Sequence, residues 1–102
     1  MIAIVDYGMG NLRSVYNAFR KVSPNLKVCV TSDLKLIQSA ERIVFPGQGA
    51  MPDCVRELAN RNLTETIIDA AKNKPFLGIC IGLQMLNDFS EEGSVPGLGI
   101  IP

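Results

Sequence analysis

The sequence of 102 residues contains no histidine. This absence removes the side chain that most often ligates metals and most often acts as a general base near neutral pH. The three cysteines form an odd set without a Cys-x-x-Cys pair. Neither a disulfide framework nor a zinc site is therefore expected, and we predict a protein without a metal or another cofactor.

An excess of one charge is also lacking, because ten basic residues balance ten acidic ones. A neutral chain has no electrostatic footprint for nucleic acid or for an anionic membrane. No apolar run approaches the ~20 residues that span a bilayer, and residues 1–6 lack the basic segment of a signal peptide. With an apolar fraction of 47%, the sequence predicts one small globular domain in the cytoplasm.

Apolar residues occur in short runs and at helical spacing, and their order predicts an α/β fold. Strands are expected at 2–5, 26–30, 42–45 and 76–79, and helices at 12–22, 53–60 and 64–71, with a short one through 36–37. Another helix is expected after Cys80, with Leu83, Leu86 and Phe89 on its apolar face. Continuous rather than alternating apolar strands indicate a mostly parallel sheet with helices on both faces.

Several side chains mark the expected ends of these elements. Pro46 is predicted to end the third strand, and no element is expected after Glu91 until 98–101. Helix N-caps are predicted at Asn11, at Ser32 or Asp33, and at Asn62 in a capping box with Glu65.

Three unusual segments follow strands of the predicted sheet. They are Gly8–Asn11, Pro46–Pro52 and the segment at Cys80. Ligands of open α/β sheets bind beyond the carboxyl ends of the strands, so we expect these segments to meet there. The first loop lacks the third glycine of a dinucleotide fingerprint, since Arg13 occupies that position.

Cys80 has Gly78 and Gly82 two residues away on either side. Small residues at this spacing are typical of a nucleophile elbow, a tight turn between a strand and a helix. The helix N-terminus would favour the thiolate. A buried packing cysteine is the alternative, but the flanking strand and helix favour a nucleophile. Cys29 and Cys54 lack such surroundings and are predicted to be packing residues.

The loop after the third strand contains Gly47 and Gly49. Glycines allow a backbone to approach a ligand closely, and backbone N–H groups here and after Cys80 are suited to stabilise an oxyanion. A plain turn between a strand and a helix is the alternative.

The segment Gly78-Ile79-Cys80-Ile81-Gly82-Leu83-Gln84 resembles the nucleophile segment of class I glutamine amidotransferases. In that family the pattern is Gly-hydrophobic-Cys-hydrophobic-Gly-x-Gln. The segments Asp6–Leu12 and Pro46–Met51 are similar to those of the glutaminase subunits of histidine biosynthesis. The resemblance covers the whole chain, and it implies a flavodoxin-like fold.

The resemblance also implies roles for individual residues. Cys80 would attack the amide of glutamine, release ammonia and form a thioester. Gly47, Gly49 and the backbone of Ile81 would stabilise the oxyanion, and Gln84 would help to hold the substrate. A (β/α)8-barrel synthase subunit would receive the ammonia within a heterodimer. Three residues of the first loop would face that partner: Gly10, Asn11 and Leu12.

The chain departs from the family in one respect, because the family completes its site with a His-x-Glu pair after the nucleophile. Residues 1–102 contain no histidine, and a cysteine nucleophile needs a base. We therefore expect residues 1–102 to be the N-terminal part of a single, truncated domain with little activity alone. Three alternatives stay open: another class I amidotransferase, another cysteine-elbow α/β protein such as a chaperone or hydrolase, and a non-catalytic partner-binding module.

Overall fold

The chain folds around a parallel β-sheet in a computed structural model that describes residues 1–8, 10–47, 51–80, 89–90 and 95–96. Its strands are β1 (Ile2–Val5), β2 (Val28–Thr31), β3 (Arg42–Gly47) and β4 (Phe76–Cys80). They pair in the order β2-β1-β3-β4, and every pairing in this four-stranded sheet is parallel. The predicted α/β class is confirmed.

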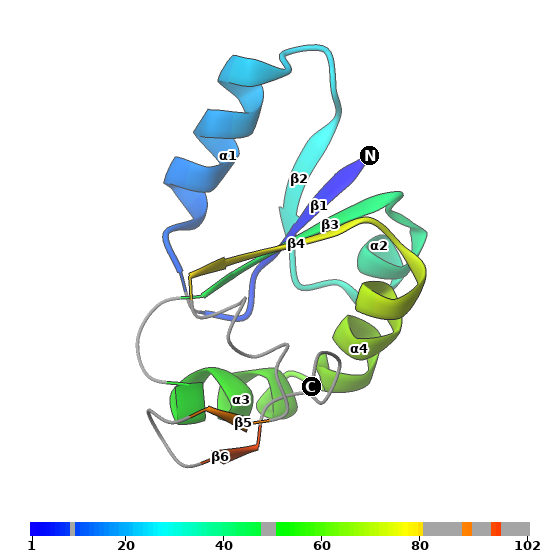
Figure 1. The fold of residues 1–102 in the computed structure, drawn as a ribbon. Coiled ribbons are helices and arrows are strands. Elements are labelled where there is room, and N and C mark those ends of the chain that lie inside the picture. The colour runs from blue at the N-terminus through cyan, green and yellow to red at the C-terminus, as the bar shows by residue number, and fades with distance from the viewer. Residues whose placement is uncertain (9, 48–50, 81–88, 91–94, 97–102) are drawn as a thin grey trace.

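Helices cover both faces of the sheet, as predicted (Figure 1). The helix α1 (Leu12–Val22) lies on one face, and α2 (Leu34–Ser39), α3 (Met51–Asn60) and α4 (Thr64–Asn73) lie on the other. Right-handed crossovers explain this division. The connection from β1 to β2 runs one way across the sheet, and the connections to β3 and β4 run the opposite way. No helix in the described ranges combines the length and the apolar character needed to cross a membrane.

The core is thicker on the face that carries three helices. There Ala3, Val5, Phe45, Leu58 and Ile67 are completely buried in one cluster. On the other face Ile2, Ile4 and Val44 pack against four residues of the predicted apolar stripe of α1, which are Leu12, Val15, Tyr16 and Phe19. The fifth predicted residue, Val22 at the end of the helix, is instead 82% exposed. No residue of α1 is fully buried. Within the described residues α1 is the one helix on this face, so this second layer is thin.

The prediction that Pro46 ends the third strand is wrong, because β3 continues to Gly47. The pairing of β1 with β3 ends at Ile4 and Val44, so Pro46 lies past the end of β1. A proline interrupts a sheet by lacking an N–H for the neighbouring strand. Here no strand of the described sheet requires that N–H, and the pairing with β4 continues through Pro46.

The predicted capping box at Asn62 is also wrong. Asn62 instead ends α3 with a positive φ of 57°. Its N–H donates to the Ala59 carbonyl at 3.1 Å, and the Leu63 N–H donates to the Leu58 carbonyl at 2.9 Å. These two bonds form a Schellman motif, which needs a left-handed residue at this position. The other predicted caps are confirmed, since Asn11 caps α1 and Asp33 caps α2.

The end of the described chain differs from the prediction as well. Phe89, expected on a helix, lies in the strand β5 (Phe89–Ser90), which pairs antiparallel with β6 (Val95–Pro96). No element had been expected at Val95. Phe89 and Val95 are both of residue types that favour extended backbone, and in the register Phe89 is paired with Pro96 and Ser90 with Val95. The part of the helix predicted after Cys80 that precedes Phe89, and the element predicted at 98–101, lie outside the described residues.

Candidate functional site

The strands β3 and β4 end side by side at the carboxyl edge of the sheet. Gly47 is the last residue of β3, Cys80 is the last residue of β4, and the two are paired in the sheet register. The helices α3 and α4 separate them in sequence, and the parallel pairing brings their backbones together. The strand that leads into the predicted elbow is thus confirmed.

The first loop reaches the same edge through Gly10. This residue has a φ of 95°, which side chains disfavour. A Cβ placed on Gly10 would lie 3.2 Å from the Cβ of Pro46 and 3.4 Å from the N of Gly47. Gly10 is therefore required by its dihedral angle and by the close approach to the end of β3. The expected meeting of the three segments is confirmed at Gly10, Gly47 and Cys80.

The start of α1 forms one wall of a cleft at this edge. The side chain of Asn11 accepts a hydrogen bond of 3.2 Å from the Ser14 N–H, and Leu12 packs on the sheet. The cleft has a volume of about 110 Å³. Its lining comes from all three neighbouring elements and includes Gly10, Asn11, Ser14, Pro46, Gly47 and Ile79.

Tyr7 lies beneath this meeting point, and its importance was missed in the sequence. Its hydroxyl donates a hydrogen bond of 2.6 Å to the Pro46 carbonyl, and its ring stacks on Phe45 with the centroids 5.2 Å apart. Burial raises the pKa of the Tyr7 hydroxyl, and contact with Cys54 raises it further. The sequence signal for its burial was the alternation of side chains in extended backbone, which places Tyr7 on the same face as Val5, two residues earlier.

Some predicted site residues are not tested by the structure. Gly49, Ile81 and Gln84 lie outside the described residues, as does the turn of the elbow. Their roles stay predictions.

The other two cysteines occupy the packing positions that were predicted for them. Cys54 is completely buried in the core beneath the sheet, where it also contacts Tyr7. Cys29 is partly buried against the same core, with its Sγ 3.6 Å from the Sδ of Met1.

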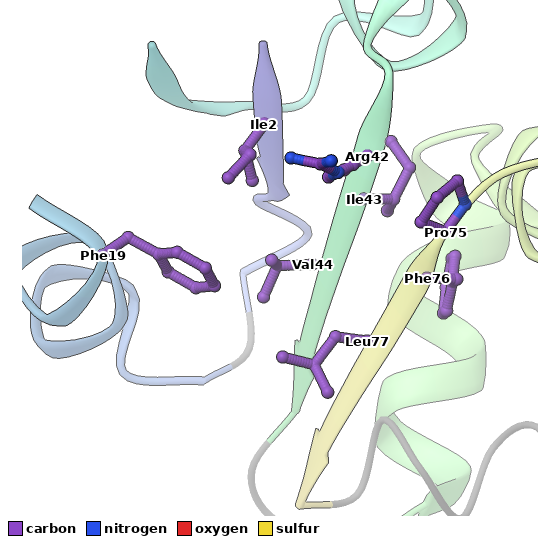
Figure 2. A pocket seen from close by; sticks show the side chains of 8 residues that line it. All are labelled: Ile2, Phe19, Arg42, Ile43, Val44, Pro75, Phe76 and Leu77. Carbon is purple, nitrogen blue, oxygen red and sulfur yellow. The ribbon is translucent and has the colours of Figure 1, made fainter. Parts of the chain in front are cut away.

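A larger cleft of about 240 Å³ lies away from this edge, on the face that carries α1. In Figure 2 the side chain of Phe19 extends from α1 toward Val44, and the side chain of Leu77 extends from β4 toward Val44 as well. Arg42 and Pro75 place the cleft beside the starts of β3 and β4. Because ligands of such sheets bind at the opposite, carboxyl end, this cleft is not the candidate site.

Comparison with known families gives a match over most of the chain. The model of the family "Glutamine amidotransferase class-I" matches residues 3–96. The chain belongs to this family. The cysteine at the end of β4 is thus set in the family's own sequence context, next to the carboxyl edge where β1 and β3 also end.

Within the family, the chain is similar to curated proteins that share one name. The chain is 64% identical over 101 residues to the imidazole glycerol phosphate synthase subunit HisH of Nitrosospira multiformis, covering 99% of this chain and 48% of the relative. The subunit of the same name from Aromatoleum aromaticum is 63% identical, with the same two coverages. That from Neisseria gonorrhoeae is 50% identical over 95% of this chain and 48% of the relative. The chain spans about half the length of the curated relatives it matches.

Proposed function

We propose that residues 1–102 are the N-terminal part of a single amidotransferase domain, in the glutaminase subunit of imidazole glycerol phosphate synthase. This subunit would hydrolyse glutamine to glutamate and ammonia in the cytoplasm, as a step of histidine biosynthesis. The names of the relatives support the assignment. The observation that carries it is the pairing of Gly47 with Cys80 beside Gly10, which joins the three similar segments at one edge.

Cys80 is the proposed nucleophile. Its thiolate attacks the side-chain amide carbon of glutamine and gives a tetrahedral oxyanion. Collapse of this intermediate breaks the C–N bond, while the departing nitrogen takes up a proton from a general acid and leaves as ammonia. A γ-glutamyl thioester remains on the sulfur. Water then attacks the thioester, releases glutamate and returns the thiol.

The proposed oxyanion donors are the backbone N–H groups of Gly49 and Ile81, which follow the paired residues Gly47 and Cys80 in sequence. Backbone donors held in place before the reaction stabilise the developing charge without reorganisation. The register between Gly47 and Cys80 supports this role, because the last described residues before the two proposed donors are paired at one edge of the sheet. Gln84 is proposed to help hold the substrate.

The base for Cys80 is proposed to lie outside residues 1–102, which contain no histidine. The family places a His-x-Glu pair after the nucleophile, and the relatives are about twice as long as this chain. We therefore expect hydrolysis only from a subunit of the relatives' length.

The proposed partner is a (β/α)8-barrel synthase subunit, bound as a heterodimer. It would use the ammonia to make imidazole glycerol phosphate and aminoimidazole carboxamide ribotide in a lyase reaction. Gly10, Asn11 and Leu12 are proposed to face it. Two observations support this: Asn11 is exposed, and all three residues lie at the same sheet edge as Cys80.

A glutamine-like diazoketone tests the chemistry directly, because it alkylates the cysteine of a working glutaminase. We expect labelling of the subunit at the relatives' length and little labelling of residues 1–102 alone. Cys80→Ala should abolish the label, whereas the matched variant Cys29→Ala should keep it. Peptide mass spectrometry locates the label.

Two outcomes would contradict the proposal. Absence of labelling in the long subunit, even with the synthase present, removes the glutaminase assignment. Synthase binding by that unlabelled subunit would instead support a non-catalytic partner-binding module. Labelling that survives Cys80→Ala would exclude Cys80 as the nucleophile.

A further inference from the structure

The Tyr7 side chain is fixed at both ends beneath the candidate site. Its hydroxyl donates to the Pro46 carbonyl at 2.6 Å, and its ring stacks on Phe45. Tyr7 has no exposed surface. A hydrogen bond of this length between completely buried groups holds the Pro46 carbonyl firmly in place.

The strand register explains why this carbonyl needs Tyr7. The Ile43 N–H donates to the Pro75 carbonyl at the start of β4, so alternate residues of β3 direct their backbone groups toward β4. Pro46 is out of phase with Ile43 and directs its carbonyl toward the β1 side. There β1 has already ended at Val5. Buried carbonyls are nearly always paired, and the Tyr7 hydroxyl takes the place of the missing strand.

The Pro46 carbonyl belongs to the same planar peptide unit as the Gly47 N–H. Gly47 is in turn paired with Cys80. We propose that Tyr7 is a positioning residue for glutamine hydrolysis, because its hydroxyl fixes the last paired peptide of β3 relative to the nucleophile strand. The proposed donor Gly49 follows that peptide in sequence. This inference rests on the proposed function.

The surroundings of Tyr7 keep its hydroxyl a donor. Burial raises the pKa of the hydroxyl well above its ordinary value, and Cys54 raises it further. Cys54 belongs to α3, so the one hydroxyl ties α3 to the ends of β1 and β3.

The test is Tyr7→Phe in the subunit at the relatives' length, assayed together with its synthase. This substitution keeps the stacked ring and removes only the hydroxyl. A misplaced peptide reduces the stabilisation of the transition state more than it weakens substrate binding. The kcat for glutamine should therefore fall roughly tenfold, with KM unchanged. The matched control is Tyr16→Phe, which removes a hydroxyl from the α1 face and should keep kcat.

Alkylation of Cys80 by iodoacetamide separates positioning from general damage. This displacement forms no oxyanion, so its rate in Tyr7→Phe should equal that of the parent, and circular dichroism against the parent gives the fraction of native sites. Unchanged kcat per native site would overturn the inference. Equal losses in alkylation and hydrolysis, or no native fraction at all, would overturn it too and leave Tyr7 a folding residue. A parent subunit that does not hydrolyse glutamine is a different result, because it removes the proposed function before any variant is compared.

Discussion

At the scale of single residues, the side chain of Lys74 connects the start of β4 to the end of α2, and the sequence did not indicate this contact. Its Nζ donates to the carbonyl of Ile37 at 3.0 Å, to that of Ala40 at 2.6 Å, and to that of Gln38. These carbonyls lie at the end of α2, where helix carbonyls lack partners within the helix. An ammonium there also complements the negative end of the helix dipole. One side chain thus ties the start of β4 to α2.

Lys74→Met should therefore destabilise the fold. The methionine keeps most of the stem, so the loss reports on the carbonyls left unpaired, at about 1–3 kcal/mol. The measurement is the urea midpoint of unfolding for the subunit at the relatives' length. The control is Lys72→Met, which removes an exposed charge from the last turn of α4. Equal midpoints for the two variants would show that the contacts of Lys74 contribute nothing.

Tyr7 makes a second prediction at this scale, about pH. Because its pKa is raised in the folded state, its contribution to stability is complete below the unfolded pKa of about 10 and is lost as pH rises beyond it. The stability advantage of the parent over Tyr7→Phe should therefore shrink above pH ~10. Urea midpoints of both proteins, measured from neutral to alkaline pH, check this. A constant difference across that range would contradict the burial of a neutral hydroxyl.

At the scale of elements, the junction of α3 and α4 shows how one residue ends a helix. Asn62 adopts a φ of 57°, and this allows the Leu63 N–H to reach back to the Leu58 carbonyl. Leu58 and Leu63 are both completely buried. The motif therefore ends α3 and brings two apolar side chains into the core, which fixes the direction in which α4 starts.

Substitutions at Asn62 should follow the left-handed backbone rather than helix propensity. Asn62→Ala should cost about 1 kcal/mol, because a Cβ without a polar group disfavours this conformation. Asn62→Gly should retain or raise stability. Asn60→Ala, in the last turn of α3, is the control and should not destabilise. Thermal melts rank the three variants, and Asn62→Ala equal to Asn62→Gly would contradict the Schellman assignment.

At the scale of the whole molecule, the two faces of the sheet are covered unequally. Three helices bury one face, while the face with α1 keeps the apolar cleft of Figure 2. Leu77 at its edge is 50% exposed although it lies in the parallel sheet. Parallel sheets are ordinarily buried on both faces. Since the relatives are about twice as long, we expect the rest of the subunit to cover Leu77.

Leu77→Lys should then act in opposite directions in two lengths of the protein. In residues 1–102 alone it should raise solubility, because it breaks an exposed apolar surface. In the long subunit it should lower stability by burying a charge. The control is Leu34→Lys, at the exposed start of α2. Sedimentation and thermal melts of both lengths check this, and a long subunit that tolerates both lysines equally would show that Leu77 stays exposed.

The sequence by itself determined the class of fold and the place of the candidate site. Continuous apolar runs at Ile2–Val5 and around Phe76 specified a parallel sheet, because continuous rather than alternating runs are typical of strands that are covered on both faces. The glycines at 10 and 47 and the cysteine at 80 then had to meet, because parallel strands place their carboxyl ends at one edge. These features are local in sequence, so pattern reasoning recovers them.

Only the tertiary structure decided the contacts between distant residues. Pro46 continues a strand because β1 has already ended beside it, and Asn62 ends α3 because Leu58 and Leu63 are both drawn into the core. Tyr7 and Lys74 bond to carbonyls 39 and 34–37 positions away in the chain. No local pattern records such partners. They depend on which backbone groups the assembled sheet and helices leave unpaired, and that is fixed only when the elements pack.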